Sequence, residues 1–289
     1  MRVTGIMTMK KSLVLDDVHL KKLQSEILDL LVEFDRICRK HHIRYFLSCG
    51  TLLGAVRHNG FIPWDNDADV ELFREDYEKF RSVCSKELGA EFFFLDHGTD
   101  ENYFWPFGKL IKVNTQYQRP SQGGLKQKNG ICIDVFVLDE MPADSCRQYL
   151  MEQITTLCRK ILWAPVGVVK LPLSITWVTF FLLSFIPRKI AFGLHQTVAR
   201  WYEGKGMPCR GFFCTSYRTS RGYALKNEWY QEALEHSFEG YEFQIPNGHH
   251  EILYLKYNDY MKYPPEEERK GSSPAEYIKF SDGEEWQAP

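Results

Sequence analysis

The chain lacks several patterns that would assign it to a class at once. Its eight cysteines include no C-x-x-C pair, which argues against a structural zinc site and against a disulfide framework. The net charge of −2 leaves no broad basic surface, so nucleic acid is disfavoured as a partner. The N-terminal MRVTGIMTMKK has no apolar stretch of the kind found in signal peptides. These absences predict a cytoplasmic protein with reduced cysteines.

One apolar run is long but falls short of a membrane span. Residues 171–186 are uncharged over 16 positions, whereas a helix needs ~20 apolar residues to cross a bilayer. Trp163, Trp177 and the adjacent basic residues suit a membrane interface. Three interpretations stay open: docking on or re-entry into a membrane, a buried helix or dimer contact, and a true span. The first implies a peripheral position on the inner membrane face.

Length and composition agree with one enzyme-sized unit, which is either a single large domain or two closely joined ones. Residues 16–42 and 74–88 are predicted helices, and strands are predicted at 43–48, 91–95, 107–113 and 130–138. The inner face of the first helix is apolar at Leu20, Leu23, Ile27, Leu30, Leu31, Phe34 and Ile37. Residues 116–129 are predicted to form a flexible loop that can fold over the substrate. The acidic tail from Glu266 is expected to fray.

Three aspartates, Asp65, Asp67 and Asp69, alternate within the stretch GTLLGAVRHNGFIPWDNDADVELF. If residues 67–73 are extended, Asp67 and Asp69 share one face while the apolar residues between them face the core. Two carboxylates ~4 Å apart repel by about 4 kcal/mol at an effective dielectric of ~20. A divalent cation is the usual compensation, although a solvated acidic turn has the same composition.

A glycine-containing turn precedes these acids. The segment Ser48-Cys49-Gly50-Thr51 follows a predicted strand and offers capping side chains before a short helix, 52–58, which Gly60 would end. Backbone N–H groups at such a junction bind anions, typically phosphate. A phosphate cradle followed by paired carboxylates suits metal-assisted phosphoryl transfer.

Asp134 interrupts the apolar run GICIDVFVL, which has the pattern of a buried strand. An isolated carboxylate in such a strand is costly unless it is paired or bound to metal. Asp134 is therefore the candidate for a third acid of the site, with a solvent-facing aspartate at the strand end as the alternative. Asp139 and Glu140 are assigned to the following loop.

The run CGTLLGAVRHNGFIPWDNDADVELFREDYEKF resembles the signature of the LicD family, which includes bacterial phosphocholine transferases and is related to the fukutin group of phosphosugar transferases. The segments FGKLIKVNT, GICIDVFVLDEMP, FEGYEFQIPN and YLKYNDYMKYPPEEER fit as well. The resemblance implies an α+β, nucleotidyltransferase-like fold: a mixed sheet flanked by helices, with a helical apolar insertion. The implied division is a catalytic core at 1–150, an apolar helical segment with the membrane-docking option at 151–205, and a C-terminal part at 206–289 that completes the same domain.

The resemblance also assigns roles to matching positions. Gly50 and Thr51 match the phosphate-binding turn, and Lys109 falls in a stretch where a phosphate or donor contact is expected. Arg57 is a further candidate for the donor diphosphate. The implied metal ligands are Asp65, Asp67, Asp69 and Asp134, and the last three are the implied catalytic residues.

The implied reaction moves phosphocholine, or a related phospho-alcohol, from a CDP-linked donor to a glycan hydroxyl with Mg²⁺ or Mn²⁺ and releases CMP. It would decorate a cell-surface glycan such as teichoic acid or lipopolysaccharide, and Asp134 is the candidate base. A lipid-linked acceptor would explain membrane contact at 171–186. The alternatives are a phosphosugar transferase using CDP-ribitol or CDP-glycerol, a nucleotidyltransferase using a free NTP, and a non-catalytic scaffold protein in glycan assembly.

Overall fold

The computed structural model describes residues 15–120, 122–170, 174–215, 224–271 and 274–288, and it opens with the predicted amphipathic helix as α1, Asp17–Lys40. Asp16 caps this helix, because its Oδ1 accepts hydrogen bonds from the backbone N–H groups of Val18 and His19. All seven apolar residues predicted for the inner face of α1 are buried. The helical spacing therefore predicted both the element and the face that it packs on the core.

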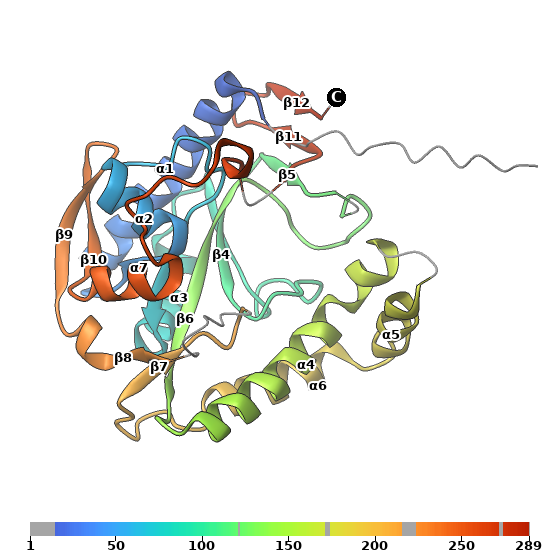
Figure 1. Cartoon of the computed structure of the whole chain (residues 1–289). Helices are drawn as coiled ribbons and strands as arrows, with labels where there is room; N and C mark the ends of the chain where they lie inside the picture. The colour runs from blue at the N-terminus through green and yellow to red at the C-terminus, as the bar shows by residue number, and fades with distance from the viewer. Residues whose placement is uncertain (1–14, 121, 171–173, 216–223, 272–273, 289) are drawn as a thin grey trace, which may run out of the picture.

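In the described residues, seven strands form the central mixed sheet (Figure 1). The main path is β1-β2-β6-β4-β3, with β7 paired to β6 and β8 paired to β7. Strands β2, Asp69–Phe73, and β6, Cys132–Met141, are parallel, and the other neighbouring pairs are antiparallel. The remaining strands are β1 Phe46–Leu47, β3 Phe92–Leu95, β4 Gly108–Lys112, β7 Cys209–Gly211 and β8 Leu225–Lys226. The mixed sheet with flanking helices confirms that part of the expected fold.

Two groups of helices accompany the sheet. Helix α3, Arg74–Glu87, contacts α1, and both pack against strands of the sheet. Helices α2, Cys49–His58, and α7, His249–Tyr257, form a second group and contact each other. Beside them lies a hairpin of β9, Ala233–Phe238, and β10, Tyr241–Pro246; the short 3-10 turns are η1 Asn227–Tyr230 and η2 Glu266–Glu268.

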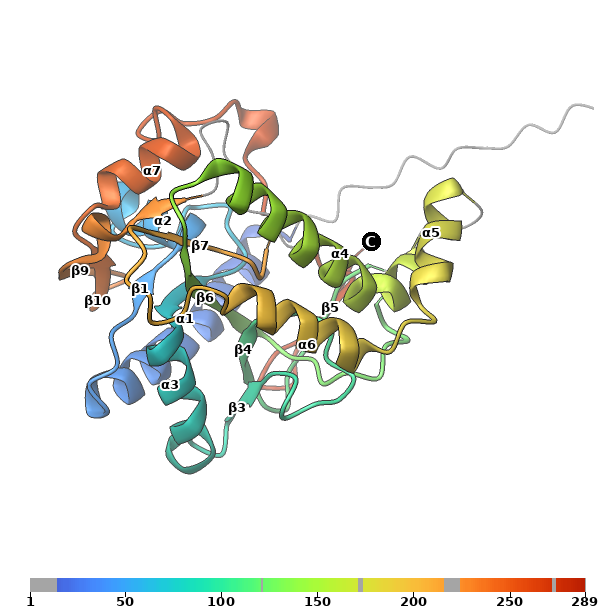
Figure 2. The ribbon, with the colours of Figure 1, turned by 90° about the horizontal axis from the view of Figure 1, so that it is seen from below.

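Three helices form an arm that follows β6. Helices α4, Ser145–Lys170, and α6, Arg188–Ala199, lie side by side, and α5, Ile175–Leu183, sits at their far end (Figures 1 and 2). The arm corresponds to the expected apolar helical insertion, although residues 171–173 of the predicted run lie outside the described residues. Across the described ranges no single helix is long and apolar enough to cross a membrane. Helices α5 and α6 meet that length and composition only together, and they are bent by 90°.

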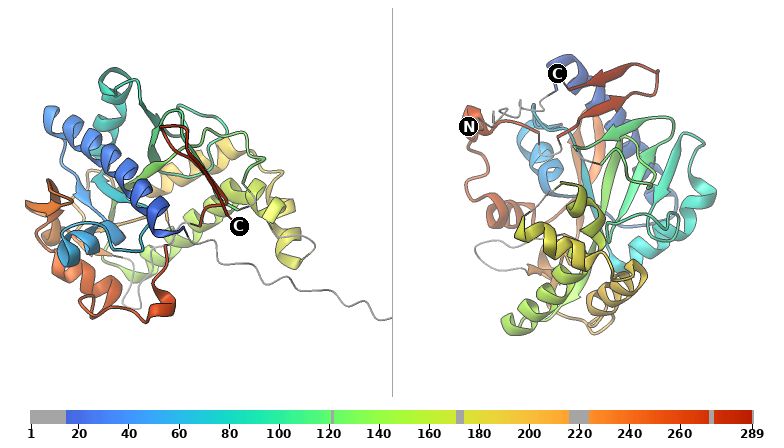
Figure 3. Two further views of the ribbon diagram at one scale, coloured as in Figure 1. Left: turned by 90° about the horizontal axis from the view of Figure 1, so that it is seen from above. Right: turned by 90° about the vertical axis from the view of Figure 1, so that its right-hand side faces the viewer.

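The C-terminal segment is ordered: it forms two strands and contacts α1. Strand β11, Tyr277–Lys279, pairs with both β12, Glu285–Gln287, and β5, Gln116–Gln118 (Figure 3). The buried Ile278 and Trp286 anchor the two C-terminal strands, and Lys22 on α1 forms ion pairs with Asp282 and Glu284. The expectation of a frayed tail was therefore wrong, and the predicted loop at 116–129 begins with a strand.

Several local boundaries also differ from expectation. Asp139 and Glu140 belong to β6 and not to the loop after it, because Asp139 meets a buried arginine there. Helix α2 already begins at Cys49, and the left-handed residue at its end is Asn59, with φ 52°, in place of Gly60. Asp67 lies just before β2 and not within the strand.

Candidate active site

Asp69 and Asp134 are neighbours across the parallel strands β2 and β6. The register pairs one with the other, and the Asp134 N–H donates to the carbonyl of Ala68 at 2.9 Å. In-register residues on adjacent strands lie ~4.8 Å apart and point to the same face. Both acids are half-buried, while the apolar residues that flank them are buried in the core. The alternation read from the sequence therefore brings these two carboxylates to one face.

The segment before β2 adds Asp65 and Asp67 to the same group. Burial, followed by the charge of Asp67, raises the pKa of Asp65 to about 8. Burial also raises the pKa of Asp69 well above its ordinary value, and the charges of Asp67 and Asp134 add to this effect. The four carboxylates thus repel one another, and the group is stabilised when protons or cations share it.

The first turn of α2 is shaped around these acids. A Cβ atom at Gly50 would lie 2.7 Å from Oδ2 of Asp65, so glycine leaves the room that this carboxylate needs. The buried Thr51 hydroxyl accepts a hydrogen bond from the Asp69 N–H at 2.8 Å, which fixes the start of β2. Gly50 and Thr51 lie inside the helix and not in a turn before it. Their contact with phosphate stays a prediction, and the structure gives both a positioning role.

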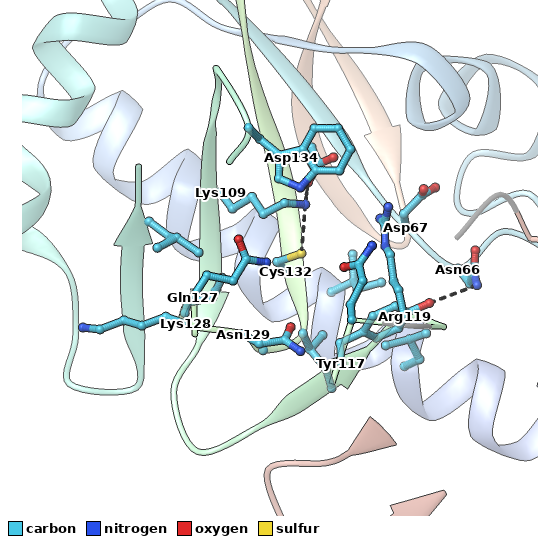
Figure 4. Close-up of a pocket in the computed structure, with 18 residues that line it drawn as sticks. Asn66, Asp67, Lys109, Tyr117, Arg119, Gln127, Lys128, Asn129, Cys132 and Asp134 are labelled. Carbon is cyan, nitrogen blue, oxygen red and sulfur yellow. Dashed lines mark hydrogen bonds and ion pairs between the residues drawn. The ribbon is translucent and has the colours of Figure 1, made fainter. Parts of the chain in front are cut away.

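Lys109 brings a positive charge to the acids from β4. The antiparallel register pairs Lys109 with Asp134, and its Nζ bonds to Oδ1 of Asp134 and lies 3.6 Å from Sγ of Cys132 (Figure 4). Burial is the largest single effect on the pKa of Lys109 and lowers it, but the charge and hydrogen bond of Asp134 together with Cys132 more than offset burial, so the pKa is raised overall. Lys109 is therefore a lasting cation beside Asp134.

Two further cations face the same acids and were not found by sequence reasoning. Arg119, just after β5, extends toward Asp67 (Figure 4); burial lowers its pKa, but nearby negative charge, that of Asp134 foremost, raises it overall. Lys256, near the end of α7, lowers the pKa of Asp69 by its charge, against the larger opposing effect of burial. Arg119 falls in the stretch read as a polar loop and Lys256 in the segment YLKYNDYMKYPP. The presence of a basic residue in each segment was the signal that could have identified these two cations.

Arg57 makes its contacts elsewhere. Its Nη1 donates to the carbonyl of Tyr260 at 2.7 Å, and its guanidinium lies 4.9 Å from the ring centroid of Tyr263. These contacts join α2 to the segment that follows α7. A role for Arg57 in holding a diphosphate stays a prediction, and the arginine that lines the pocket beside the acids is Arg119.

A pocket opens between the acids and the segment after β5. Of the four carboxylates, those of Asp67 and Asp134 line it. The predicted substrate loop contributes the amide side chains of Gln127 and Asn129 to the wall, while the Lys128 ammonium extends away to the Phe93 ring (Figure 4). The lining that matters for chemistry comprises Asp67, Asp134, Lys109, Arg119, Trp105 and Tyr117. Carboxylates, cations and aromatic rings therefore meet in one concave site.

The donor chemistry of this site fits a hard divalent cation, because carboxylate oxygens are the ligands that Mg²⁺ prefers. Among the residues that the structure describes, however, no three His, Cys, Asp or Glu side chains are arranged to hold one ion. Asp134 is bonded to Lys109 in this arrangement. Shared coordination by Asp67, Asp69 and Asp134 stays a prediction, and it requires Lys109 to release Asp134.

Comparison with known proteins identifies the class. A family model described as LicD/FKTN/FKRP, nucleotidyltransferase domain, matches residues 42–152, which contain all eight predicted site residues. The chain belongs to the LicD family, as the resemblance implied. It is 31% identical over 263 residues to the Haemophilus influenzae protein named lipopolysaccharide cholinephosphotransferase LicD, an alignment that covers 87% of this chain and 94% of that one.

A shorter similarity is to two mammalian proteins. Over 48 residues the chain is 42% identical to the human and the mouse ribitol 5-phosphate transferase FKRP, which is 17% of this chain and 10% of each relative. The coarse assignment follows from the long alignment: the chain is a LicD-family phosphotransferase.

Proposed function

We propose that the chain transfers phosphocholine, or a related phospho-alcohol, from a CDP-linked donor to a glycan hydroxyl and releases CMP. The observation that carries this proposal is the extent of the similarity to the Haemophilus cholinephosphotransferase, which covers 87% of this chain and is not confined to the acidic motif. The layout of the pocket supports the same reaction class, since it combines carboxylates with fixed cations.

The cations are suited to the donor diphosphate. Lys109 and Arg119 line the pocket from β4 and from the end of β5, and the charge of Lys256 reaches Asp69 from α7. Charge-assisted hydrogen bonds from such groups to phosphate oxygens are about twice as strong as neutral ones. The N-terminal turn of α2, next to Asp65, adds the positive end of a helix dipole.

Mg²⁺ or Mn²⁺ is the proposed cofactor, and the carboxylates of Asp65, Asp67, Asp69 and Asp134 are the proposed ligands. The support is their oxygen chemistry and their mutual repulsion, seen in the raised pKa values of Asp65 and Asp69. Bound there, the ion would neutralise charge on the phosphate oxygens.

Asp134 is the proposed general base, because its carboxylate lines the pocket. It would take the proton from the acceptor hydroxyl while that oxygen attacks the phosphorus atom bearing the choline. One O–P bond forms, the bond from that phosphorus to the CMP oxygen breaks, and CMP leaves as a phosphate monoester.

Trp105 is the proposed contact for the choline group. A quaternary ammonium has no hydrogen-bond donor, and an aromatic face binds it by a cation–π interaction of about 2 kcal/mol when desolvated. Trp105 is half-buried and lines the pocket near Lys109. We expect Trp105→Ala to raise KM for CDP-choline at least about tenfold, and Trp105→Phe to retain most binding. The KM for CDP-ribitol should not respond to either change.

The deciding experiment incubates the purified full chain and a glycan extract with CDP-choline, CDP-ribitol, CDP-glycerol or CTP in the presence of Mg²⁺. CMP formed from CDP-choline supports the proposal. CMP from CDP-ribitol or CDP-glycerol alone would indicate a phosphosugar transferase, for which the 48-residue FKRP similarity is the motivating observation. Pyrophosphate from CTP would indicate a nucleotidyltransferase, and no product from any donor would favour a scaffold protein.

A further inference from the structure

Helix α5 carries an apolar surface that nothing in the described chain covers. No residue of α5 is buried, and Ile175 is 89% exposed. Phe185, in the turn that follows, is 70% exposed. We define the α5 surface as the exposed apolar residues Ile175, Val178, Phe181, Leu182, Phe185 and Ile186. Monomeric soluble proteins rarely expose contiguous apolar patches larger than about a few hundred Å², so six exposed apolar side chains gathered on one short segment indicate a binding site.

The α5 surface is held in a fixed orientation by the other side of the helix. The Phe180 ring lies 5.3 Å from Trp163 on α4, and the indole N–H of Trp177 donates to the carbonyl of Val168 at 3.1 Å. The Trp177 and Phe181 rings stack at 12°. These contacts tie α5 to the end of α4, and the helix lies at the tip of the arm, away from the sheet (Figure 2).

The sequence segment that forms this tip carries charged residues of one sign only. Residues 153–202 contain no Asp or Glu but carry Arg159, Lys160, Lys170, Arg188, Lys189 and Arg200. Arg159 and Arg200 pair with Glu152 and Glu78, respectively. Lys160 and Lys189 are exposed. An apolar, aromatic surface flanked by lysines is complementary to a lipid interface with anionic headgroups.

We propose that the α5 surface docks the chain on an anionic phospholipid bilayer. A protein partner would need acidic groups to match the flanking lysines, and a second copy of this chain would place its own lysines there instead. Burial of the six side chains in the interface region gives the apolar contribution, and each basic residue near the surface adds electrostatic attraction to the anionic headgroups.

Docking would hold the pocket close to the bilayer, because the arm contacts a loop next to the pocket. Arg188 Nη1 donates to the Asn102 carbonyl at 2.9 Å, and the ring of Phe192 stacks on His97 with centroids 3.8 Å apart. The same loop provides Trp105 to the pocket. Insofar as it rests on the proposed function, this arrangement fits an acceptor glycan carried on a lipid.

The test is co-sedimentation of the full chain with vesicles of phosphatidylcholine, with and without phosphatidylglycerol. The test variant is Val178→Ser, Leu182→Ser and Phe185→Ser together. The matched control is Val18→Ser, Leu150→Ser and Tyr149→Ser, which removes equally exposed side chains from α1 and from the opposite end of α4. We expect the test variant to bind at least about 100-fold more weakly, and the control to bind like the unmodified chain.

A second measurement does not depend on how the triple variant folds. Bromine-labelled lipids should quench the tryptophan fluorescence of the unmodified chain more than that of Trp177→Phe, since the Trp177 ring stacks on Phe181 of the docking surface. Equal quenching, unchanged binding of the test variant, or no binding of the unmodified chain to anionic vesicles would overturn the proposal. Two other results would also overturn it. One is a dimer of the unmodified chain in lipid-free solution that the test variant no longer forms, which would indicate a contact between copies. The other is retention of the chain in membranes after alkaline carbonate washing, which would indicate a membrane span. Neither assay uses a donor or metal, so failure here is distinct from failure of the proposed reaction.

Discussion

The Arg74 guanidinium donates two hydrogen bonds to the Asp139 carboxylate, from Nε to Oδ1 and from Nη2 to Oδ2, each 2.7 Å long. Arg74 directly follows β2 and Asp139 lies near the end of β6, whereas Asp69 and Asp134 lie at the beginnings of the same two strands. The pair therefore ties together the far ends of the strands that carry the acids. Its side chains are only 7% and 4% exposed.

Arg74→Gln should lower the free energy of unfolding by about 3–5 kcal/mol, because it leaves the buried Asp139 carboxylate without its partner. The matched control is Lys226→Gln, which breaks an ion pair to Glu228 with both side chains 59% exposed and should cost less than about 1 kcal/mol. Urea unfolding followed by circular dichroism measures both. Equal losses in the two variants would show that burial does not set the contribution of the Arg74–Asp139 pair.

Gly50→Ala should reduce turnover at least about tenfold, since displacing a catalytic group by 1 Å can cost ~10²-fold. The added Cβ would push the Asp65 carboxylate, whose Oδ2 lies 2.7 Å from that position. Stability should change little, because the displaced atom is the end of a flexible side chain. Gly193→Ala on α6 meets nothing within 4 Å, and it should stabilise the helix by about 0.5–1 kcal/mol without changing turnover. Steady-state kinetics and thermal melting compare the two; normal turnover of Gly50→Ala would contradict the tight fit to Asp65.

Lys109 and Lys112 lie on the same strand but should differ in what their loss affects. Lys109→Gln should lower turnover by about 10²–10³-fold, because it removes a cation from the pocket. Lys112 instead bonds Glu26 at 2.8 Å and Asp29 at 2.6 Å on α1. Lys112→Gln should therefore lower Tm by a few degrees and leave kcat unchanged. A loss of turnover in Lys112→Gln as large as that in Lys109→Gln would show that strand β4 matters only as a scaffold.

His195 should make the fold less stable in acid. It is 1% exposed, its Nε2 lies 2.8 Å from the Phe213 carbonyl oxygen, and burial lowers its pKa to about 3. Below the unfolded pKa of ~6.5 the unfolded chain binds a proton that the folded chain does not, so this group costs stability as the pH falls, by about 2 kcal/mol at pH 5.

His195→Gln should remove that pH dependence, so the loss of unfolding free energy between pH 7 and pH 5 should be about 2 kcal/mol smaller than in the unmodified chain. Chemical denaturation at the two pH values measures the difference. His97, whose pKa burial lowers to about 4, is present in both proteins and so cancels. A larger acid loss in the variant would mean that His195 is protonated in the folded chain.

Local patterns in the sequence predicted the buried faces of the fold and two of the acids of the candidate site. The apolar spacing of α1 and the alternation around Asp69 predicted which faces are buried, because periods of 3.6 and 2.0 residues record the core directly. The same alternation and the apolar run around Asp134 predicted Asp69 and Asp134 as site residues, and the sheet places these two acids side by side. The LicD likeness read from the motif was confirmed by the long alignment.

Only the tertiary structure decided which charges oppose those acids. Arg119 and Lys256 reach the site from segments 50 or more residues away from the Asp65–Asp69 motif, and Asp139 stays in its strand because an arginine after β2 meets it. The C-terminal strands likewise exist because β5 offers an edge for them. Hydrogen bonds and ion pairs between distant segments leave no periodic trace in a sequence, since their free energy depends on distances that form only when the chain has folded.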